Sequence, residues 1–262
     1  DTFTYTLTDG DGDKDTARIS FNVTDKETPI QINGYGTTDD TIVDNAGRDV
    51  ETGKINVNYQ GDTPGKTFGN GSFSSSDTTL THAGTAIKVT YDAAKGTYTG
   101  KAGSTTIFTM KINSNGTFTF TQNDSIDHSN TASHNESLLL KFGVTAQDAD
   151  GDKGNGTVTI RVYDDGPNAV NDATRTLDDG NSVSGNLLAN DDVGADGGRI
   201  TSVRFGSTDY SVPASGTRTI TTSEGVFTIR SNGAYTYKGN KEGSDTFTYT
   251  LTDGDGDKDT AR

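Results

Sequence analysis

The sequence predicts an all-β fold in which several β-sandwich domains follow one another along the chain. Large apolar residues alternate with threonine over short segments, which is typical of strands with one buried and one solvated face. Turn signals separate these segments about every 8–12 residues, a spacing typical of immunoglobulin-like sandwiches. Long stretches of sequence also recur, so the 262 residues hold more than one copy of a related unit.

The expected strands are short. Four segments show the alternation most clearly: Phe3–Leu7, Ile19–Val23, Ile55–Tyr59 and Val158–Val162. Two further pairs of alternating segments are joined through Asn-Gly: Thr105–Ile112 with Thr117–Thr121, and Val226–Arg230 with Ala234–Tyr237. Asn-Gly tolerates the positive φ angles of tight turns, so we expect a β-hairpin at each pair. The stretch Gly61–Thr85, rich in Gly, Ser and Thr, predicts only a long loop or poorly patterned strands.

The chain repeats itself at its two ends and once between them. Asp1–Arg18 and Asp245–Arg262 have the same sequence, and Phe142–Asp164 aligns without gaps on Phe3–Asp25. Identity over such a distance indicates a tandem array of related domains.

This repetition divides the chain into three parts. Residues 1–25 are expected to be the C-terminal strands of a preceding repeat. Residues 26–166 form a longer repeat with an insertion within Thr121–Ser137, and residues 167–262 form a shorter one. The boundaries lie at Lys26–Pro29 and Asp165–Pro167, where acidic residues, Gly and Pro end an alternating strand.

The shorter repeat is expected to lack its last strand. It ends at Arg262, before the segment that would correspond to the strand Ile19–Val23 at the head of the chain. We therefore expect a sheet edge to be exposed. One hypothesis is that the head of one molecule completes the tail of the next. Light scattering that shows only monomers at high concentration would contradict it.

Aspartate dominates the charge. Acidic residues number 37 against 22 basic ones, for a net charge of −15, and because only five are glutamate, 32 are aspartate. No basic stripe is present that could displace the counterions of a nucleic acid, and no apolar run approaches the ~18 residues of a membrane span. Cysteine is absent, which excludes disulfides and fits an exported bacterial protein.

One acidic motif recurs at homologous places. Asp-x-Asp-x-Asp occurs as Asp9, Asp11 and Asp13, as Asp148, Asp150 and Asp152, and as Asp253, Asp255 and Asp257. In extended or loop backbone, side chains two residues apart point to the same side, so three carboxylates can converge. Ca²⁺ takes roughly 6–8 oxygen ligands, and each loop would supply about half of such a shell. We therefore expect several bound Ca²⁺ ions.

The motif also has three other possible interpretations. An EF-hand would need Gly and Glu where, counting from Asp9, Lys14 and Ser20 stand, so that interpretation fails. A nonapeptide β-roll would need Gly-Gly-x-Gly-x-Asp repeats, and none occurs. A solvated acidic turn without metal stays open, since Asp-Gly turns are common, although three homologous copies favour calcium.

Other aspartates are expected to complete the shells. Those at the domain exits and entries could share an ion across the junction: Asp25, Asp164, Asp165 and Asp172. A further Asp/Gly loop adds Asn190, Asp191, Asp192 and Asp196. Aspartate also caps turns without any metal, so four other aspartates are only weaker candidates for metal ligands: Asp39, Asp40, Asp124 and Asp127.

Catalysis is not expected. The three histidines, His82, His128 and His134, lie in loops rich in Ser, Thr and Asn with no nucleophile motif beside them. The spacing of His128 and His134 matches no helical zinc motif, and no acid/base pair is positioned by the sequence.

The order and spacing of these motifs resemble the cadherin-like and immunoglobulin-like extender repeats of giant bacterial adhesins, often called RTX or biofilm adhesins. In the shorter repeat the resemblance is carried by Asn171-Asp172, Val183–Asp191 and Phe247–Lys258. In the longer repeat it is carried by Phe118–Phe120, Asp127-His128, Leu138–Phe142 and Asp148–Asp152.

The resemblance implies an extracellular rod at the bacterial cell surface. Such proteins are exported by type I secretion, and their repeats hold a ligand-binding tip away from the cell for attachment and biofilm formation. It also implies neighbouring repeats as partners, and calcium held by the Asp-x-Asp-x-Asp positions and the junction aspartates. The family's secretion signal and retention module have no counterpart here, so we expect anchoring to lie elsewhere. The competing hypothesis is a ligand-binding module, in which the insertion within Thr121–Ser137 grips a glycan or a host protein.

Overall fold

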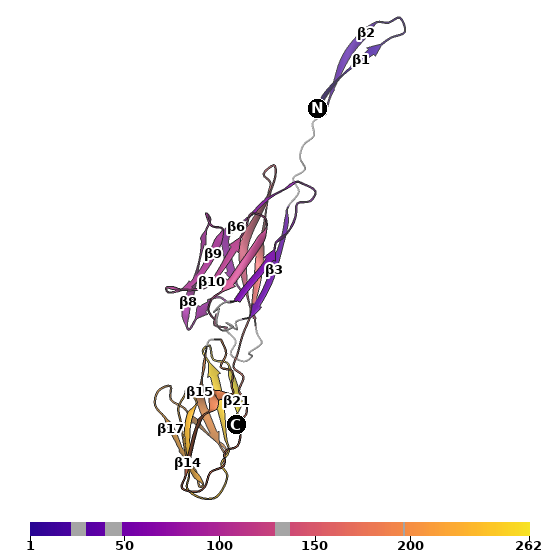
Figure 1. Ribbon diagram of the computed structural model, residues 1–262. Helices are drawn as coiled ribbons and strands as arrows, with labels where there is room; N and C mark the ends of the chain where they lie inside the picture. The colour runs from indigo at the N-terminus through magenta and orange to yellow at the C-terminus, as the bar shows by residue number, and fades with distance from the viewer. Residues whose placement is uncertain (22–29, 40–48, 129–136, 196) are drawn as a thin grey trace.

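The structure is a computed structural model that describes residues 1–21, 30–39, 49–128, 137–195 and 197–262 (Figure 1). Nearly every regular element in these ranges is a strand, and the one helix is a 3₁₀ turn, η1 (Leu187–Ala189). No helix of the described residues is long and apolar enough to cross a membrane. Each of the two domains packs two sheets around its own apolar core, so the predicted all-β sandwich fold is confirmed.

Domain one, the longer repeat, contains a six-stranded and a five-stranded sheet. The first has the order β4 (Asp49–Lys54), β11 (Thr117–Gln122), β10 (Thr105–Ile112), β9 (Thr97–Ala102), β8 (Thr85–Asp92) and β7 (Thr81–His82). The second has the order β5 (Asn56–Asn58), β3 (Gln31–Asp39), β13 (Lys153–Tyr163), β12 (Ser137–Asp148) and β6 (Pro64–Ser75). Strands β3 and β13 are parallel, whereas β12 pairs with β13 and with β6 in antiparallel fashion.

An aromatic cluster fills the core of domain one. Phe118 and Phe120 alternate with threonine along β11 and are at most 1% exposed, as the sequence pattern predicts. Tyr98 and Phe108 of the same sheet meet Phe142 of the other, with ring centroids 5.4 and 6.0 Å apart. Each buried aromatic ring removes about 150–250 Å² from water, so these contacts between the sheets dominate the packing.

For Gly61–Thr85 the sequence predicted either a long loop or poorly patterned strands, and the long loop is wrong. It forms the long strand β6, which pairs with β12 through an irregular register. The hydroxyl of Tyr91 donates a 2.7 Å hydrogen bond to the carbonyl of Gly69, and a Cβ on Gly69 would lie only 2.8 Å from the Tyr91 ring. The alternative, a poorly patterned strand, is therefore correct. The apolar pattern is poor because Gly69 makes room for the Tyr91 ring from β8.

Domain two, the shorter repeat, contains two four-stranded sheets. The first has the order β14 (Ser182–Asn186), β19 (Ala234–Gly239), β18 (Gly225–Ile229) and β17 (Arg218–Thr221). The second has the order β16 (Thr208–Ser211), β15 (Gly198–Phe205), β20 (Phe247–Asp253) and β21 (Lys258–Ala261). Buried residues of both sheets, among them Val203, Phe227, Ile229 and Tyr249, form its core.

Both predicted Asn-Gly hairpins are present. Strands β10 and β11 are joined by a turn in which Gly116 has φ 81° and donates its N–H to the carbonyl of Asn113. Strands β18 and β19 are joined in the same way, with Gly233 at φ 82° donating to Arg230. Only glycine adopts such angles without strain, which is why these turns were predictable.

The head of the chain forms the hairpin β1 (Thr2–Thr8) and β2 (Lys14–Ser20). Its apolar face is open, since Phe3 is 56% and Leu7 69% exposed. The expected strand Ile19–Val23 is reached only at its start, because β2 ends at Ser20 and residues 22 and 23 lie outside the described part.

The last strand of domain two, β21, matches only the first part of β2, Lys14–Ala17. Strand β21 pairs with β20 from Thr252↔Lys258 to Tyr249↔Ala261. The identical hairpin at the head of the chain pairs three residues further, to Thr2↔Ser20.

Candidate metal centre at the domain junction

The three Asp-x-Asp-x-Asp motifs lie in the turns that join β1 to β2, β12 to β13, and β20 to β21. All three turns have the same geometry. Oδ1 of the first aspartate accepts hydrogen bonds of 2.7–3.1 Å from the backbone N–H groups three and four residues later. The glycine between the second and third aspartates has positive φ in each turn: Gly12 at 102°, Gly151 at 118° and Gly256 at 116°.

The first aspartate of each motif thus shapes its turn. One of its carboxylate oxygens accepts hydrogen bonds from the backbone of its own turn. A solvated Asp-Gly turn without metal would have the same hydrogen bonds between its first aspartate and the backbone. Asp9, Asp148 and Asp253 are therefore the turn-forming residues of the three motifs.

Carboxylates converge in two of the three turns. Asp9, Asp11 and Asp13 each offer an oxygen within 4.8 Å of the others, and so do Asp148, Asp150 and Asp152. The contact with the Asp11 side chain and the backbone N–H of Asp13 lower the pKa of Asp9. Burial acts to raise the pKa of Asp148, but hydrogen bonds from Asp150 and the backbone outweigh it and lower that pKa. Both first aspartates are therefore ionised at neutral pH.

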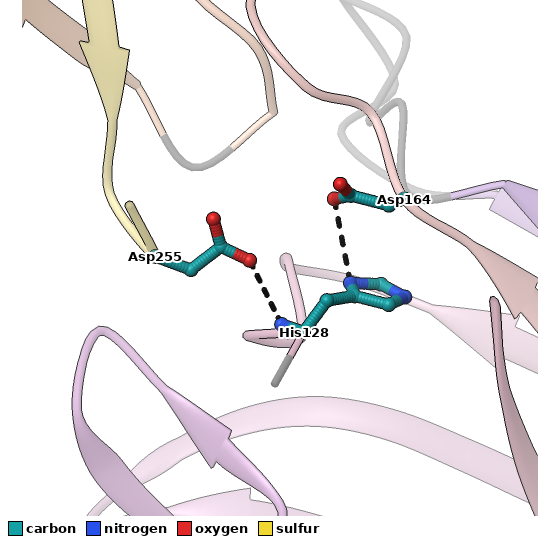
Figure 2. A group of neighbouring side chains, drawn as sticks. All are labelled: His128, Asp164 and Asp255. Carbon is teal, nitrogen blue, oxygen red and sulfur yellow. Dashed lines mark hydrogen bonds and ion pairs between the residues drawn. The ribbon is translucent and has the colours of Figure 1, made fainter. Parts of the chain in front are cut away.

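The third turn faces the other domain. In Figure 2, Asp255 of the β20–β21 turn points toward His128 and Asp164 of domain one. Asp164 directly follows β13, and His128 lies in the insertion that follows β11. Each of the three residues offers a ligand atom within 4.8 Å of the others. The structure thus brings together Asp164 and Asp255, two residues that the sequence predicted as ligands on opposite sides of the junction.

Several atoms of this junction cluster, His128, Asp164, Asp255 and Asp257, have no hydrogen-bond partner. The backbone N–H of His128 donates a 2.9 Å hydrogen bond to Asp255 Oδ2, while its Nδ1 lies 3.4 Å from Asp164 Oδ1 without a hydrogen bond. Within the junction cluster, the buried atoms without a hydrogen-bond partner are His128 Nδ1, Asp164 Oδ2, Asp255 Oδ1, and both carboxylate oxygens of Asp257. His128 is 5% and Asp257 only 1% exposed. Buried polar atoms without partners are costly, so this arrangement favours a ligand among them.

The electrostatics of the junction cluster are unfavourable to negative charge. Burial, the contact with the Asp257 side chain and the nearby charges of Asp255, Asp257 and Asp253 raise the pKa of Asp164 to about 8. In the described residues no lysine or arginine forms an ion pair with Asp164, Asp255 or Asp257. A divalent cation would supply the missing positive charge.

A second acidic group lies inside domain two. The hydroxyl of Tyr249 donates to both oxygens of Asp191, at 3.0 and 2.8 Å, and the backbone N–H of Val170 donates to Asp191 Oδ1. Burial, and then the charge of Asp191, raise the pKa of Asp172, whose Oδ2 has no hydrogen-bond partner. Asn190 donates its side-chain N–H to the carbonyl of Val170. Asp172, Asn190 and Asp191 therefore lie together, although Asp191 is engaged by tyrosine and backbone.

The remaining predicted ligands are not brought into either group. Asp165 accepts from Ala195 through its backbone carbonyl, and Asp192 pairs through its backbone with Asn168. Asp124 lies 3.7 Å from His82, and Asp127 accepts hydrogen bonds from the backbone of residues 83 and 84. The predictions for Asp25, Asp40 and Asp196, and for the side chain of Asp39, fall outside the described residues.

The sequence did not single out His128 as a ligand. In the sequence it is one of three histidines in polar loops, and no recognisable motif surrounds it. Its partner Asp255 is 127 residues away in the sequence, so no local spacing could reveal the contact. The apolar residue Ile126, two positions before His128, is the local signal that this loop packs inward, and it is 1% exposed.

Two family models match this chain, over different residues. Residues 22–161 match the family described as "Domain of unknown function (DUF5801)", and residues 164–262 match the family described as "Bacterial Ig domain". No curated protein matches the chain significantly.

Solved structures show only distant similarity. The protocadherin GammaB4 extracellular domain is 11% identical at a TM-score of 0.29, and the alignment covers 99% of this chain but 38% of that one. The YadV chaperone is 10% identical at a TM-score of 0.24, with 90% of this chain and 100% of that one covered. This chain therefore spans well under half the length of the protocadherin chain. Residues 164–262 match the "Bacterial Ig domain" family, and since the other family match covers more than half of its residues, the chain belongs to the family described as "Domain of unknown function (DUF5801)".

Proposed function

We propose that this chain is a spacer segment of a bacterial cell-surface adhesin, stiffened by divalent cations in its Asp/Gly turns and at its domain junction. The observation that carries the proposal is the junction cluster, in which carboxylates from two domains are buried together with unpartnered oxygens. Such a group is stable only when positive charge enters it, and the ion would then touch both domains at once.

Calcium is the cation proposed for the all-oxygen turns. Ca²⁺ prefers carboxylate and carbonyl oxygens, and the turns at Asp9 and Asp148 each gather three carboxylates. Extracellular modules of this kind bind calcium with dissociation constants of about 10⁻⁴–10⁻³ M, which matches its concentration outside cells. At a concentration of about one to ten times its dissociation constant, one ion that binds only the folded state adds about 0.4–1.4 kcal/mol of stability.

The junction is short enough for one ion to stiffen it. Asp164 follows β13 directly, and Asn168 already pairs with Asp192 inside domain two, so only residues 165–167 separate the two domains. A linker of this length leaves little freedom once its ends are held. The proposed role is therefore mechanical: ordered repeats would project a distal binding tip for surface attachment and biofilm formation.

Three further elements of the proposal come from the resemblance to adhesin repeats. These are export by type I secretion, an extracellular location, and neighbouring repeats of a longer chain as partners. The match of domain two to bacterial Ig domains supports them, because repeats of that kind are typical of surface proteins. No catalytic activity is proposed.

The competing hypothesis gave the insertion in domain one a ligand-binding role. In its described part, Ser125, Ile126 and His128 are at most 5% exposed, and Asp127 holds the backbone of residues 83 and 84. These residues pack against domain one and the junction, which favours the mechanical role over a gripping loop.

A thermal melt tests the proposal. We expect the melting temperature to rise in millimolar Ca²⁺ relative to EDTA, and to rise much less in Mg²⁺, which dehydrates reluctantly and prefers strict octahedral geometry. Asp150→Asn should reduce the calcium effect, whereas Asp179→Asn, a change at an exposed aspartate of domain two, should leave it intact. Equal melting temperatures in EDTA and Ca²⁺ would overturn the proposal.

A further inference from the structure

The junction cluster contains a nitrogen donor, which separates it from the two all-oxygen turns. His128 is 5% exposed, and its Nδ1 faces the Asp164 carboxylate at 3.4 Å (Figure 2). Its other ring nitrogen, Nε2, lies 3.5 Å from the backbone carbonyl of Val162. A carbonyl can only accept, so Nε2 carries a hydrogen, and Nδ1 is the ring atom that faces the cluster.

A histidine held in this way has the arrangement of a metal ligand. Metal-binding imidazoles commonly donate their second nitrogen to a backbone carbonyl or a carboxylate, which fixes the tautomer and the ring orientation. Here Val162 supplies that carbonyl. Two unpartnered oxygens that could bind the same metal ion, Asp164 Oδ2 and Asp255 Oδ1, come from the two different domains.

A protonated histidine alone would not satisfy the junction cluster. An imidazolium would bring one positive charge to Asp164, Asp255 and Asp257, and it would leave both oxygens of the 1% exposed Asp257 without a partner. A bound dication brings two positive charges and can be contacted by several oxygens.

The donor set decides which dication fits best. Nδ1 and Asp164 Oδ1 are 3.4 Å apart, a spacing that two ligands of one ion adopt for either zinc or calcium. Calcium takes oxygen ligands, however, whereas imidazole with carboxylates suits Zn²⁺ and its neighbours in the first transition row.

We propose that the junction is a transition-metal site, in which His128 Nδ1, Asp164 and Asp255 bind Zn²⁺ or a similar dication across the two domains. Asp257 lies beside Asp164 as a further carboxylate of the site. The inference rests on the proposed function, since it names the preferred ion of the proposed junction site. Calcium would occupy the same carboxylates only when present in large excess.

The test uses the whole chain after removal of metals. Zn²⁺ is titrated by calorimetry, and Co²⁺ is added as a spectroscopic probe, because its visible absorption reports nitrogen coordination. We expect a Zn²⁺ affinity well above that for Ca²⁺, and His128→Gln should lower the Zn²⁺ affinity at least about tenfold and change the Co²⁺ spectrum. The calcium-induced rise in melting temperature should persist in His128→Gln.

Two controls keep the outcome clear. His82→Gln alters the other described histidine, which lies 3.7 Å from an aspartate in domain one, and should leave Zn²⁺ binding unchanged. If His128→Gln does not fold, Asp255→Asn tests the same site from domain two and should lower the Zn²⁺ affinity.

Zn²⁺ binding that is absent, or that is indifferent to both His128 and Asp255, would overturn the inference. If calcium still stabilises the chain in that case, the proposed function stands. Loss of the calcium effect in the unmodified chain would instead overturn the proposed function.

Discussion

The same aspartate has two different environments in this chain. Asp13 in the head hairpin is exposed, whereas Asp257, at the matching position of an identical sequence, is 1% exposed with both carboxylate oxygens unpartnered. The turn geometry is the same in both copies, so the difference comes from the domain that packs against Asp257. Local sequence therefore determines the turn, and the junction determines its charge balance.

Asp257→Asn should change stability in opposite directions with and without cations. In EDTA the substitution removes a buried negative charge beside Asp164, so the melting temperature of domain two should rise, by an amount on the order of 1 kcal/mol or roughly 4–8 °C. In saturating Ca²⁺ or Zn²⁺ the variant should be less stable than the unmodified chain, because a ligand is lost. Calorimetric melts measure both effects, with Asp179→Asn as the control. The same sign in both conditions would contradict a cation at the junction.

The pH dependence of stability follows from Asp164. Its pKa is raised to about 8 in the folded chain, above the ordinary value of 3.8, so the folded state favours the protonated carboxyl. Without cations, this contribution to stability is fully present below about pH 4 and is lost as the pH rises toward 8. Melts in a metal-free buffer series should show that decline, and Asp164→Asn should flatten it. An equal decline in the variant would assign the effect to other groups.

At the scale of single elements, the strands and tight turns were predictable because their causes are local. Threonine and phenylalanine alternate along β11, and Asn-Gly marks both predicted hairpins. Strand β6 was harder to predict, since Gly69 is explained by the Tyr91 ring of another strand. The parallel pairing of β3 with β13 has no signal in either segment.

The repeated hairpin provides a matched test of burial. Tyr249 on β20 is 1% exposed and Tyr5 on β1 is 55% exposed, in identical local sequence. Tyr249→Ala should destabilise domain two by about 3–5 kcal/mol, the usual cost of removing a buried aromatic ring. Tyr5→Ala should change stability by less than about 0.5 kcal/mol. Chemical denaturation measures both values, and equal costs would contradict the different packing of the two hairpins.

The turn of the third acidic motif provides a second test at this scale. Gly256 has φ 116°, an angle that other residues adopt only with strain, whereas Gly254 is not among the positive-φ glycines. Gly256→Ala should therefore cost more than about 1 kcal/mol and weaken cation binding at the junction, and Gly254→Ala should do neither. Denaturation and Zn²⁺ calorimetry on the two variants provide the comparison. Similar losses in both would show that the turn angle is not the cause.

At the scale of the whole molecule, the two sandwiches follow each other with their junction at residues 164–168 (Figure 1). The sequence predicted that Asp164 and Asp165 could share an ion with Asp172, whereas the structure places Asp164 beside Asp255 of the third acidic turn. It did not predict His128, because the insertion reaches the junction only through tertiary packing. Nor did it predict that Asp191 would be engaged by Tyr249, a contact between distant segments.

Small-angle X-ray scattering of the chain with and without cations tests the central claim most directly. With Ca²⁺ or Zn²⁺ bound, we expect one narrow distribution of distances between the two domains, consistent with a stiff rod. In EDTA, and in an Asp164→Asn and Asp255→Asn double variant with cations present, the distribution should broaden as the domains move independently. A distribution that is the same with cations, in EDTA and in the double variant would contradict a rod held by ions at its junction.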